Sequence, residues 1–198
     1  MKKLTWVLPL VLALGLAGCG QKQSSDNDSS SSAVKTSKTS SSSTTTSSAK
    51  VDVKVTFDQA WQTFTDKHAD AAVTNVELDK GMSGYEYKIE GTSNDQEYEL
   101  VLDAQTGKTV REHQEKLDAD EANGVQKRED GIKKTGLKNI DDVTKIAEKQ
   151  AKGTASQWDL SKDDGSTTWE VKVQQGHQST EVTIDAYSGA VVNTEQDD

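Results

Sequence analysis

An internal repeat constrains the fold of this chain more than any other feature of its sequence. The segment 103–107, Asp-Ala-Gln-Thr-Gly, recurs 82 positions later at 185–189 as Asp-Ala-Tyr-Ser-Gly. The same offset aligns like residues in the preceding stretch: Leu102 with Ile184, Leu100 with Val182, Ile89 with Val171, Tyr87 with Trp169, and Leu78 with Leu160. One further residue of offset aligns Asp58 with Asp141 and Phe64 with Ala147. A repeat of this length spans a whole folding unit, so the chain is expected to contain two copies of one arrangement.

The first copy has the pattern of one helix followed by antiparallel strands. Its apolar residues Phe57, Ala60, Trp61 and Phe64 recur at helical spacing, and Thr56 is expected to be the N-cap. Apolar and polar residues then alternate over 73–78, 85–89 and 98–103, which is typical of half-buried strands.

The second copy repeats this order. Asp141 or Asp142 is expected to cap a helix that carries Val143, Ile146 and Ala147. Strands are expected at 157–160, 169–173 and 180–185, with Val191-Val192 closing the chain.

The predicted fold class is therefore α+β: two tandem units, each one helix packed on a small antiparallel sheet of three to four strands, after a disordered tether. Trp61 and Trp158 are expected in the cores of the two units. Because each unit has its own apolar set, we expect the units to fold semi-independently, with their sheets not merged into one.

The repeated Asp-Ala-x-[Ser/Thr]-Gly segment is expected to be a structural turn. Asp103 and Asp185 would accept backbone N–H groups, and Gly107 and Gly189 would supply the positive φ that turns the chain back. A catalytic or ligand-binding role is the alternative, but Asp with Ser or Thr and no base is not a nucleophile pair.

The predicted boundaries are a first unit at 51–112, a charged linker at 113–136 and a second unit at 137–195. Residues 111–122 are polar and suit a solvated helix, which Asn123-Gly124 would end. A rigid arm and a floppy spacer both fit this linker.

The first residues resemble the signal of a bacterial lipoprotein. Three residues, Met1-Lys2-Lys3, precede an apolar run over 4–16 that is short for a membrane span, and Leu16-Ala17-Gly18 leads to the sole cysteine, Cys19. The resemblance implies a signal peptide at 1–18, cleavage between Gly18 and Cys19, and a diacylglycerol anchor on Cys19 at the extracytoplasmic face of the cell membrane. An ordinary secretory signal with a chance cysteine is the alternative.

Residues 19–50 are expected to form a flexible, disordered tether. Ser and Thr fill 18 of the 27 positions from 24 to 50, so little apolar surface is available for folding. Residues 51–198 carry a net charge of −14, which suggests repulsion from an anionic membrane or, alternatively, serves solubility alone.

The residue inventory disfavours an enzyme. The chain's net charge of −10 argues against a nucleic-acid partner, and a single cysteine excludes disulfides and cysteine-rich metal sites. His68, His113 and His177 lie apart in sequence and are expected to be solvated. No catalytic, cofactor or metal site is predicted, although weak Ca²⁺ binding by acidic pairs and a glycosidase carboxylate pair stay open.

The repeated unit is similar to the PepSY domain. The resemblance rests on the terminal segments 102–109 and 184–191 and on the aromatic-rich middle strands 85–89 and 169–173. It implies extracytoplasmic modules without catalytic residues, of a kind also found in propeptides of thermolysin-like proteases. The expected function is binding of a peptide or protein partner at the cell surface, with strand addition at a sheet edge as the natural mode. The alternative is an inhibitor or chaperone of a secreted or cell-surface protease.

Overall fold

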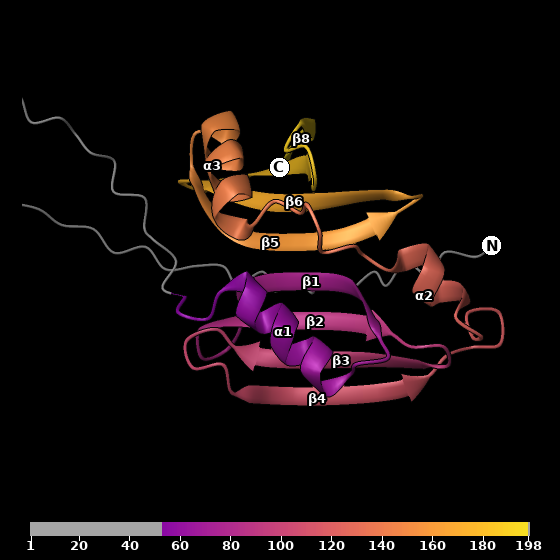
Figure 1. The fold of residues 1–198 in the computed structure, drawn as a ribbon. Helices are drawn as coiled ribbons and strands as arrows, with labels where there is room; N and C mark the ends of the chain where they lie inside the picture. The colour runs from indigo at the N-terminus through magenta and orange to yellow at the C-terminus, as the bar shows by residue number, and fades with distance from the viewer. Residues whose placement is uncertain (1–52, 198) are drawn as a thin grey trace, which may run out of the picture. The chain divides into compact units, whose positions relative to one another are not determined.

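The computed structural model describes residues 53–197. The expectations for the signal peptide, Cys19 and the tether fall outside these residues. Figure 1 shows the order of the elements, in which two helix-and-strand units follow each other along the chain.

The first unit begins with helix α1 (Phe57–Lys67). Thr56 caps this helix by accepting a hydrogen bond from the Gln59 N–H at 3.2 Å, while the Gln59 side chain accepts the Thr56 N–H at 2.8 Å. The apolar face of α1 is buried, as its helical spacing predicted. Four strands follow: β1 (Ala72–Lys80), β2 (Tyr85–Thr92), β3 (Gln96–Asp103) and β4 (Thr109–Lys116).

Strand β4 corrects the expectation of a solvated helix over residues 111–122. Its residues are all exposed, and they pair with β3 in a register that places Glu112 opposite Leu100. Main-chain pairing with β3 makes this segment a strand. An edge strand needs few apolar side chains of its own, so its polar sequence is compatible with this position.

The connection between the units is packed against strands β1 and β2 of the first unit and also contacts β5 of the second. It contains the short helix α2 (Val125–Asp130), and the side chains of Leu117, Ala122 and Ile132 are buried. The Ile132 N–H donates to the Val73 carbonyl at 2.8 Å. The connection is therefore a docked segment rather than a floppy spacer.

The second unit repeats the order with helix α3 (Ile140–Ala151) and strands β5 (Thr154–Asp163), β6 (Ser166–Gln175), β7 (Gln178–Asp185) and β8 (Val191–Asp197). The cap of α3 is Asn139, which accepts the Asp142 N–H at 2.9 Å, and not Asp141 or Asp142 as expected. Both aspartates lie in the first helical turn, where the helix dipole favours negative charge.

The strands of both units form one eight-stranded antiparallel sheet in the order β4-β3-β2-β1-β5-β6-β7-β8. The expectation of two separate sheets was therefore wrong. Each unit alone would leave its first strand with an unpaired edge, and pairing residues 75–78 of β1 with residues 158–161 of β5 joins these two edges.

Both helices pack on the same face of this sheet, over one continuous apolar core. Val76 of β1 and Leu160 of β5 lie opposite each other and are fully buried. Phe57 of α1 reaches across to Trp169 of β6, with ring centroids 5.4 Å apart in an edge-to-face arrangement. The two units therefore share one apolar core in this structure instead of each enclosing its own.

Candidate binding surface

An approximate two-fold axis relates the two units at the centre of the sheet. Val76 pairs with Leu160, and Leu78 pairs with Trp158. Exchanging each residue for its repeat equivalent, 82 positions away, turns the first pair into the second. The same exchange leaves the pair of Glu77 and Asp159 unchanged, because these two residues are each other's equivalents. The axis therefore passes between Glu77 and Asp159, two carboxylates on the sheet face that carries no helix.

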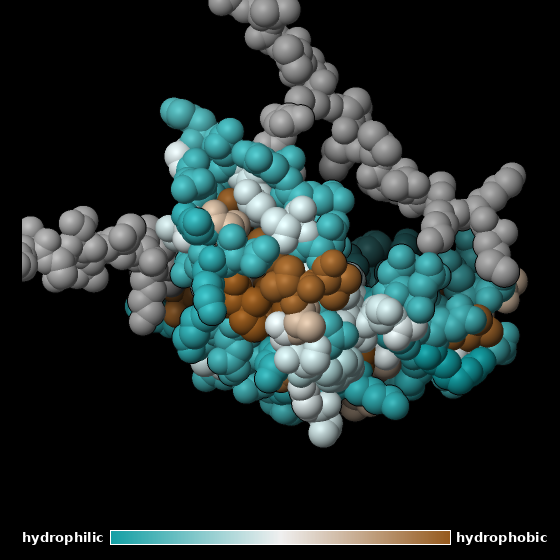
Figure 2. Space-filling view, turned by 90° about the horizontal axis from the view of Figure 1, so that it is seen from above, coloured by the Kyte–Doolittle hydropathy of each residue, from teal (hydrophilic) through white to brown (hydrophobic). Residues whose placement is uncertain are grey.

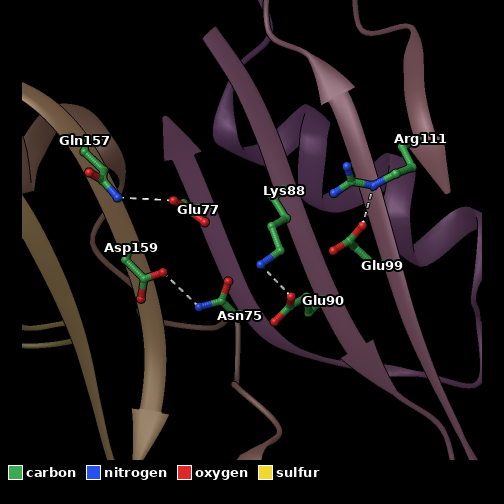
Figure 3. A network of polar contacts seen from close by, with 8 residues as sticks. All are labelled: Asn75, Glu77, Lys88, Glu90, Glu99, Arg111, Gln157 and Asp159. Atoms are coloured by element: carbon green, nitrogen blue, oxygen red, sulfur yellow. Dashed lines mark hydrogen bonds and ion pairs between the residues drawn. The ribbon is translucent and has the colours of Figure 1, made fainter. Parts of the chain in front are cut away.

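Two amide side chains hold these carboxylates (Figure 3). Asn75 Nδ2 donates to Asp159 Oδ2 at 3.0 Å, and Gln157 Nε2 donates to Glu77 Oε1 at 3.2 Å. The repeat offset relates Asn75 to Gln157 and Glu77 to Asp159, so the two hydrogen bonds are symmetry equivalents. Burial raises the pKa of both carboxyl groups.

The helix-free face is strongly acidic. Alternation along the strands places on it the carboxylates Glu77, Asp79, Glu86, Glu90, Glu97, Glu99, Glu115, Asp159, Glu170, Glu181 and Glu195. The basic side chains of this face are Lys88, Arg111 and Lys172. Lys88 forms an ion pair with Glu90 at 2.7 Å, and Arg111 forms one with Glu99 at 2.8 Å.

Like charge is concentrated at both ends of this face. Burial and then the charge of Glu90 raise the pKa of Glu97 in the first unit. Burial and then the charge of Glu181 raise the pKa of Glu170 in the second. A surface of this sign attracts cationic ligands and repels anionic ones.

The two outer edges of the sheet differ in character. At the β4 edge, Glu112 pairs with Lys67 of α1 at 2.6 Å, and charged residues dominate the strand. At the β8 edge, Val191 is 40% exposed and Val192 is 63% exposed. Figure 2 shows a hydrophobic patch within hydrophilic surface on the side of the molecule where α3 and β8 lie. Charges protect an edge strand against pairing, whereas exposed apolar residues favour it.

The repeated turn after β3 and β7 has the same geometry twice. Asp103 Oδ1 accepts the N–H and the hydroxyl of Thr106, both at 2.7 Å, and Asp185 Oδ1 accepts those of Ser188 at the same distance. These bonds hold the pKa of both aspartates below the usual range. The glycine that ends each turn has a left-handed backbone, with φ of 72° and 77°.

Each turn also positions the start of a helix. The carbonyl of Ala104 accepts the Val55 N–H at 2.9 Å, and the carbonyl of Ala186 accepts the Lys138 N–H at 2.8 Å. Tyr87 Oη donates to the Val55 carbonyl at 3.1 Å, and Trp169 Nε1 donates to the Lys138 carbonyl at 3.0 Å. The repeated turn and the repeated aromatic residue thus act together to fix the chain before each helix.

Comparison with known proteins identifies this arrangement. A family model described as "Peptidase propeptide and YPEB domain", or PepSY, matches residues 54–113 and 138–195. The chain belongs to the PepSY family. Both matched regions contain one helix and its strands, so the resemblance drawn from the repeat is confirmed.

A solved structure has the same tandem architecture. The crystal structure of a Clostridium difficile 630 protein, provisionally described as a lipoprotein, superimposes with a TM-score of 0.71 at 26% sequence identity. The match covers 75% of this chain and 97% of that chain. Among curated proteins, no sequence matches.

The histidines of the PepSY repeats do not gather at a site. His68 lies almost buried at the end of α1, stacked on Tyr98 with ring centroids 4.2 Å apart, and burial lowers its pKa. The expectation of a solvated His68 was therefore wrong, because the ring fills a gap between α1 and β3. His113 and His177 are exposed.

The two tryptophans predicted to be core residues are buried in the PepSY repeats. Trp61 is 6% exposed and Trp158 is 2% exposed. Trp158 Nε1 donates to Thr144 Oγ1 of α3 at 2.8 Å, which ties the helix to β5.

Residues 53–197 contain no group of three or more metal-ligating side chains. Over the same residues, no helix has the length and apolar character needed to cross a bilayer. The sequence reasoning missed the acidic face and the difference between the two edges. The alternation of Glu and Lys along the strands could have predicted the acidic face. Which strands lie at the edges depends on the strand order, which the sequence pattern does not show.

Proposed function

We propose that this protein is a lipid-anchored, extracytoplasmic binding or regulatory PepSY lipoprotein without catalytic activity, which engages a peptide or protein partner at the bacterial cell surface by strand addition to β8. The observation that carries the proposal is the exposed edge of β8, with Val191 and Val192 uncovered at the end of an eight-stranded sheet. An added strand would gain main-chain hydrogen bonds along this edge.

The merged sheet limits the number of strand edges at which a partner strand could be added. Pairing of β1 with β5 removes two of the four edges that separate units would have offered, and leaves β4 and β8. The β4 edge is guarded by charges, including the ion pair between Lys67 and Glu112. The β8 edge is therefore favoured.

The side chains of β8 suggest a preferred peptide. Val191 and Thr194 lie opposite the buried residues Ile184 and Val182 and so share the helix side of the sheet. Asn193 and Glu195 lie on the acidic side. A strand that alternates apolar or β-branched residues with Lys or Arg would match both sides.

The proposed location rests on the first nineteen residues of the sequence. Cys19 follows Leu16-Ala17-Gly18 at the end of an apolar signal, and it would carry the lipid. The provisional description of the Clostridium difficile structure as a lipoprotein supports this placement. Two acyl chains would anchor the protein stably, which one chain does not.

The test compares two matched substitutions in a soluble form that begins at Gly20. Val192→Lys changes the β8 edge, and Val110→Lys changes the equivalent repeat position on β4, where the valine is 55% exposed. The probe is a labelled extended peptide that alternates valine and lysine, followed by fluorescence anisotropy. A peptide of the same charge interrupted by proline is the control, because proline cannot donate to a ladder.

We expect Val192→Lys to weaken binding about tenfold, equivalent to about 1.4 kcal/mol, and Val110→Lys to change it little. Equal effects of the two substitutions, or equal binding of the proline-containing peptide, would contradict strand addition at β8.

Restraint of a protease is the second candidate function, and the family description as a peptidase propeptide domain favours it. The same soluble form would be added to secreted proteases of the source bacterium. Inhibition that saturates with protein concentration would support this function, and unchanged hydrolysis would reject it.

A further inference from the structure

A polar groove of about 460 Å³ lies between helix α1 and the turn that follows β3. The helix lines it with side chains that recur on one side of α1, namely Gln59, Gln62, Thr63 and Asp66. The turn lines it with Gln105 and Thr106. The groove therefore lies outside the β8 edge and the acidic face.

The second repeat fills the corresponding place with its own side chains. Ile146 of α3 takes the position of Thr63, and Lys138 takes the position of Val55 before the helix. Both side chains lie against Gly189 of the repeated turn. A Cβ added to this glycine would be 3.2 Å from Ile146 Cδ1 and 3.4 Å from Lys138 Cε.

The turn of the first repeat has no such cover. A Cβ added to Gly107 would have one neighbour within 4 Å among the described residues, Val55 Cγ2 at 3.5 Å. The Thr63 side chain does not reach the turn, and its hydroxyl donates to the Gln59 carbonyl at 2.8 Å. Because the second repeat builds the same helix and turn with this space filled, the fold of the repeat does not require the groove.

The hydrogen-bonding groups of α1 suit a ligand that has both donors and acceptors. Gln59 Oε1 accepts the Thr56 N–H at 2.8 Å, and Gln62 Nε2 donates to Asp66 Oδ1 at 2.6 Å. The Gln59 amide nitrogen and the Gln62 oxygen are left to meet a ligand, the first as a donor and the second as an acceptor.

The lining of the groove distinguishes between classes of ligand. Val55 supplies its only apolar side chain, and Lys54 and Asp66 contribute one charge of each sign. Sites for apolar ligands are lined mostly by hydrophobic side chains, and an added peptide strand needs an open strand edge. A helix side and a turn offer neither, so an uncharged ligand covered with hydroxyl groups fits better.

We propose that this groove binds a short, uncharged oligosaccharide that carries hydroxyl and acetamido groups. An acetamido group offers one N–H and one carbonyl to the glutamine amides, and its methyl group matches the apolar contact at Val55. The proposal concerns the first repeat alone and is independent of the peptide partner proposed for β8.

The experiment titrates the soluble chain from Gly20 with triacetylchitotriose and follows the side-chain amide signals of Gln59 and Gln62 by NMR. We expect saturable shifts with a dissociation constant of about 1 mM. Thr63→Ile and Gln62→Lys each introduce the residue of the second repeat and should weaken binding about tenfold. Thr63→Ser keeps the groove open and should bind as wild type does.

Three results would overturn the proposal. The first is the absence of saturable shifts in the wild-type chain. The second is unchanged binding in both Thr63→Ile and Gln62→Lys, which would place the sugar elsewhere on the protein. The third is an equal response to tetra-alanine, which would make the groove a peptide site.

Discussion

Substitution of Leu160 by Ala tests whether the two PepSY repeats share one cooperative core. Leu160 is fully buried in β5 and lies directly opposite Val76 of β1, so its side chain belongs to both repeats. Its repeat equivalent is Leu78, which is 2% exposed and lies opposite Trp158. The two leucines form a matched pair, one in each repeat.

The expected loss of stability is large. Truncation of a fully buried leucine in a well-packed core costs about 3–5 kcal/mol, because transfer and cavity terms add. A domain of this size is stable by about 5–15 kcal/mol in total. We therefore expect Leu160→Ala to lower the melting temperature by roughly 10 °C.

Hydrogen exchange in increasing urea, read by mass spectrometry, distinguishes a shared core from separate ones. Peptides from β3 report on the first repeat and peptides from β7 on the second. If the core is shared, Leu160→Ala lowers the unfolding midpoint of β3 as much as that of β7. Leu78→Ala should produce the same coincident shift.

The reasoning fails if β3 keeps its wild-type midpoint in Leu160→Ala while β7 loses protection. That result would mean that the β1–β5 pairing joins two cores that unfold separately.

Three further predictions concern charge, turns and anchoring. Burial raises the pKa of Asp159 in the folded state, so the stability that the protonated carboxyl group contributes is lost as pH rises through that pKa. The Asp159→Asn variant should therefore melt at a higher temperature than wild type at pH 7 but not at pH 3. Equal melting temperatures at pH 7 would contradict this. Gly107→Ala and Gly189→Ala should each lower the free energy of unfolding, measured in urea, by about 1–2 kcal/mol. The loss should be larger at Gly189, where an added Cβ would lie 3.2 Å from Ile146. An unchanged free energy of unfolding would argue against the left-handed turns. Cys19→Ala should release soluble protein or leave uncleaved precursor in a fractionation assay, and a membrane-bound mature form would disprove the lipid anchor.

The local structure of each repeat could be predicted from the sequence. The helical spacing of Phe57, Ala60, Trp61 and Phe64 placed α1, and alternation placed the middle strands of both repeats. These signals lie between residues close in sequence, where helix and strand periods differ plainly. The 82-residue repeat then extended the assignment from one unit to the other and indicated the PepSY family.

The remaining features depended on contacts between distant residues. β4 was mistaken for a helix because its polar residues have no apolar period, and only pairing with β3 makes it a strand. His68 is buried because β3 brings Tyr98 beneath it.

The merging of the two sheets is the clearest example of a feature that depends on contacts between residues distant in sequence. The sequence by itself determined that there are two similar units, each with a complete apolar face. Only the tertiary structure decided that Val76 would meet Leu160, more than eighty residues away, because an unpaired edge is satisfied by whichever strand the fold brings to it. The same pairing decides that β4 and β8 are the outer edges of the sheet, whereas the alternation of charged residues along the strands already carried a signal for the acidic face.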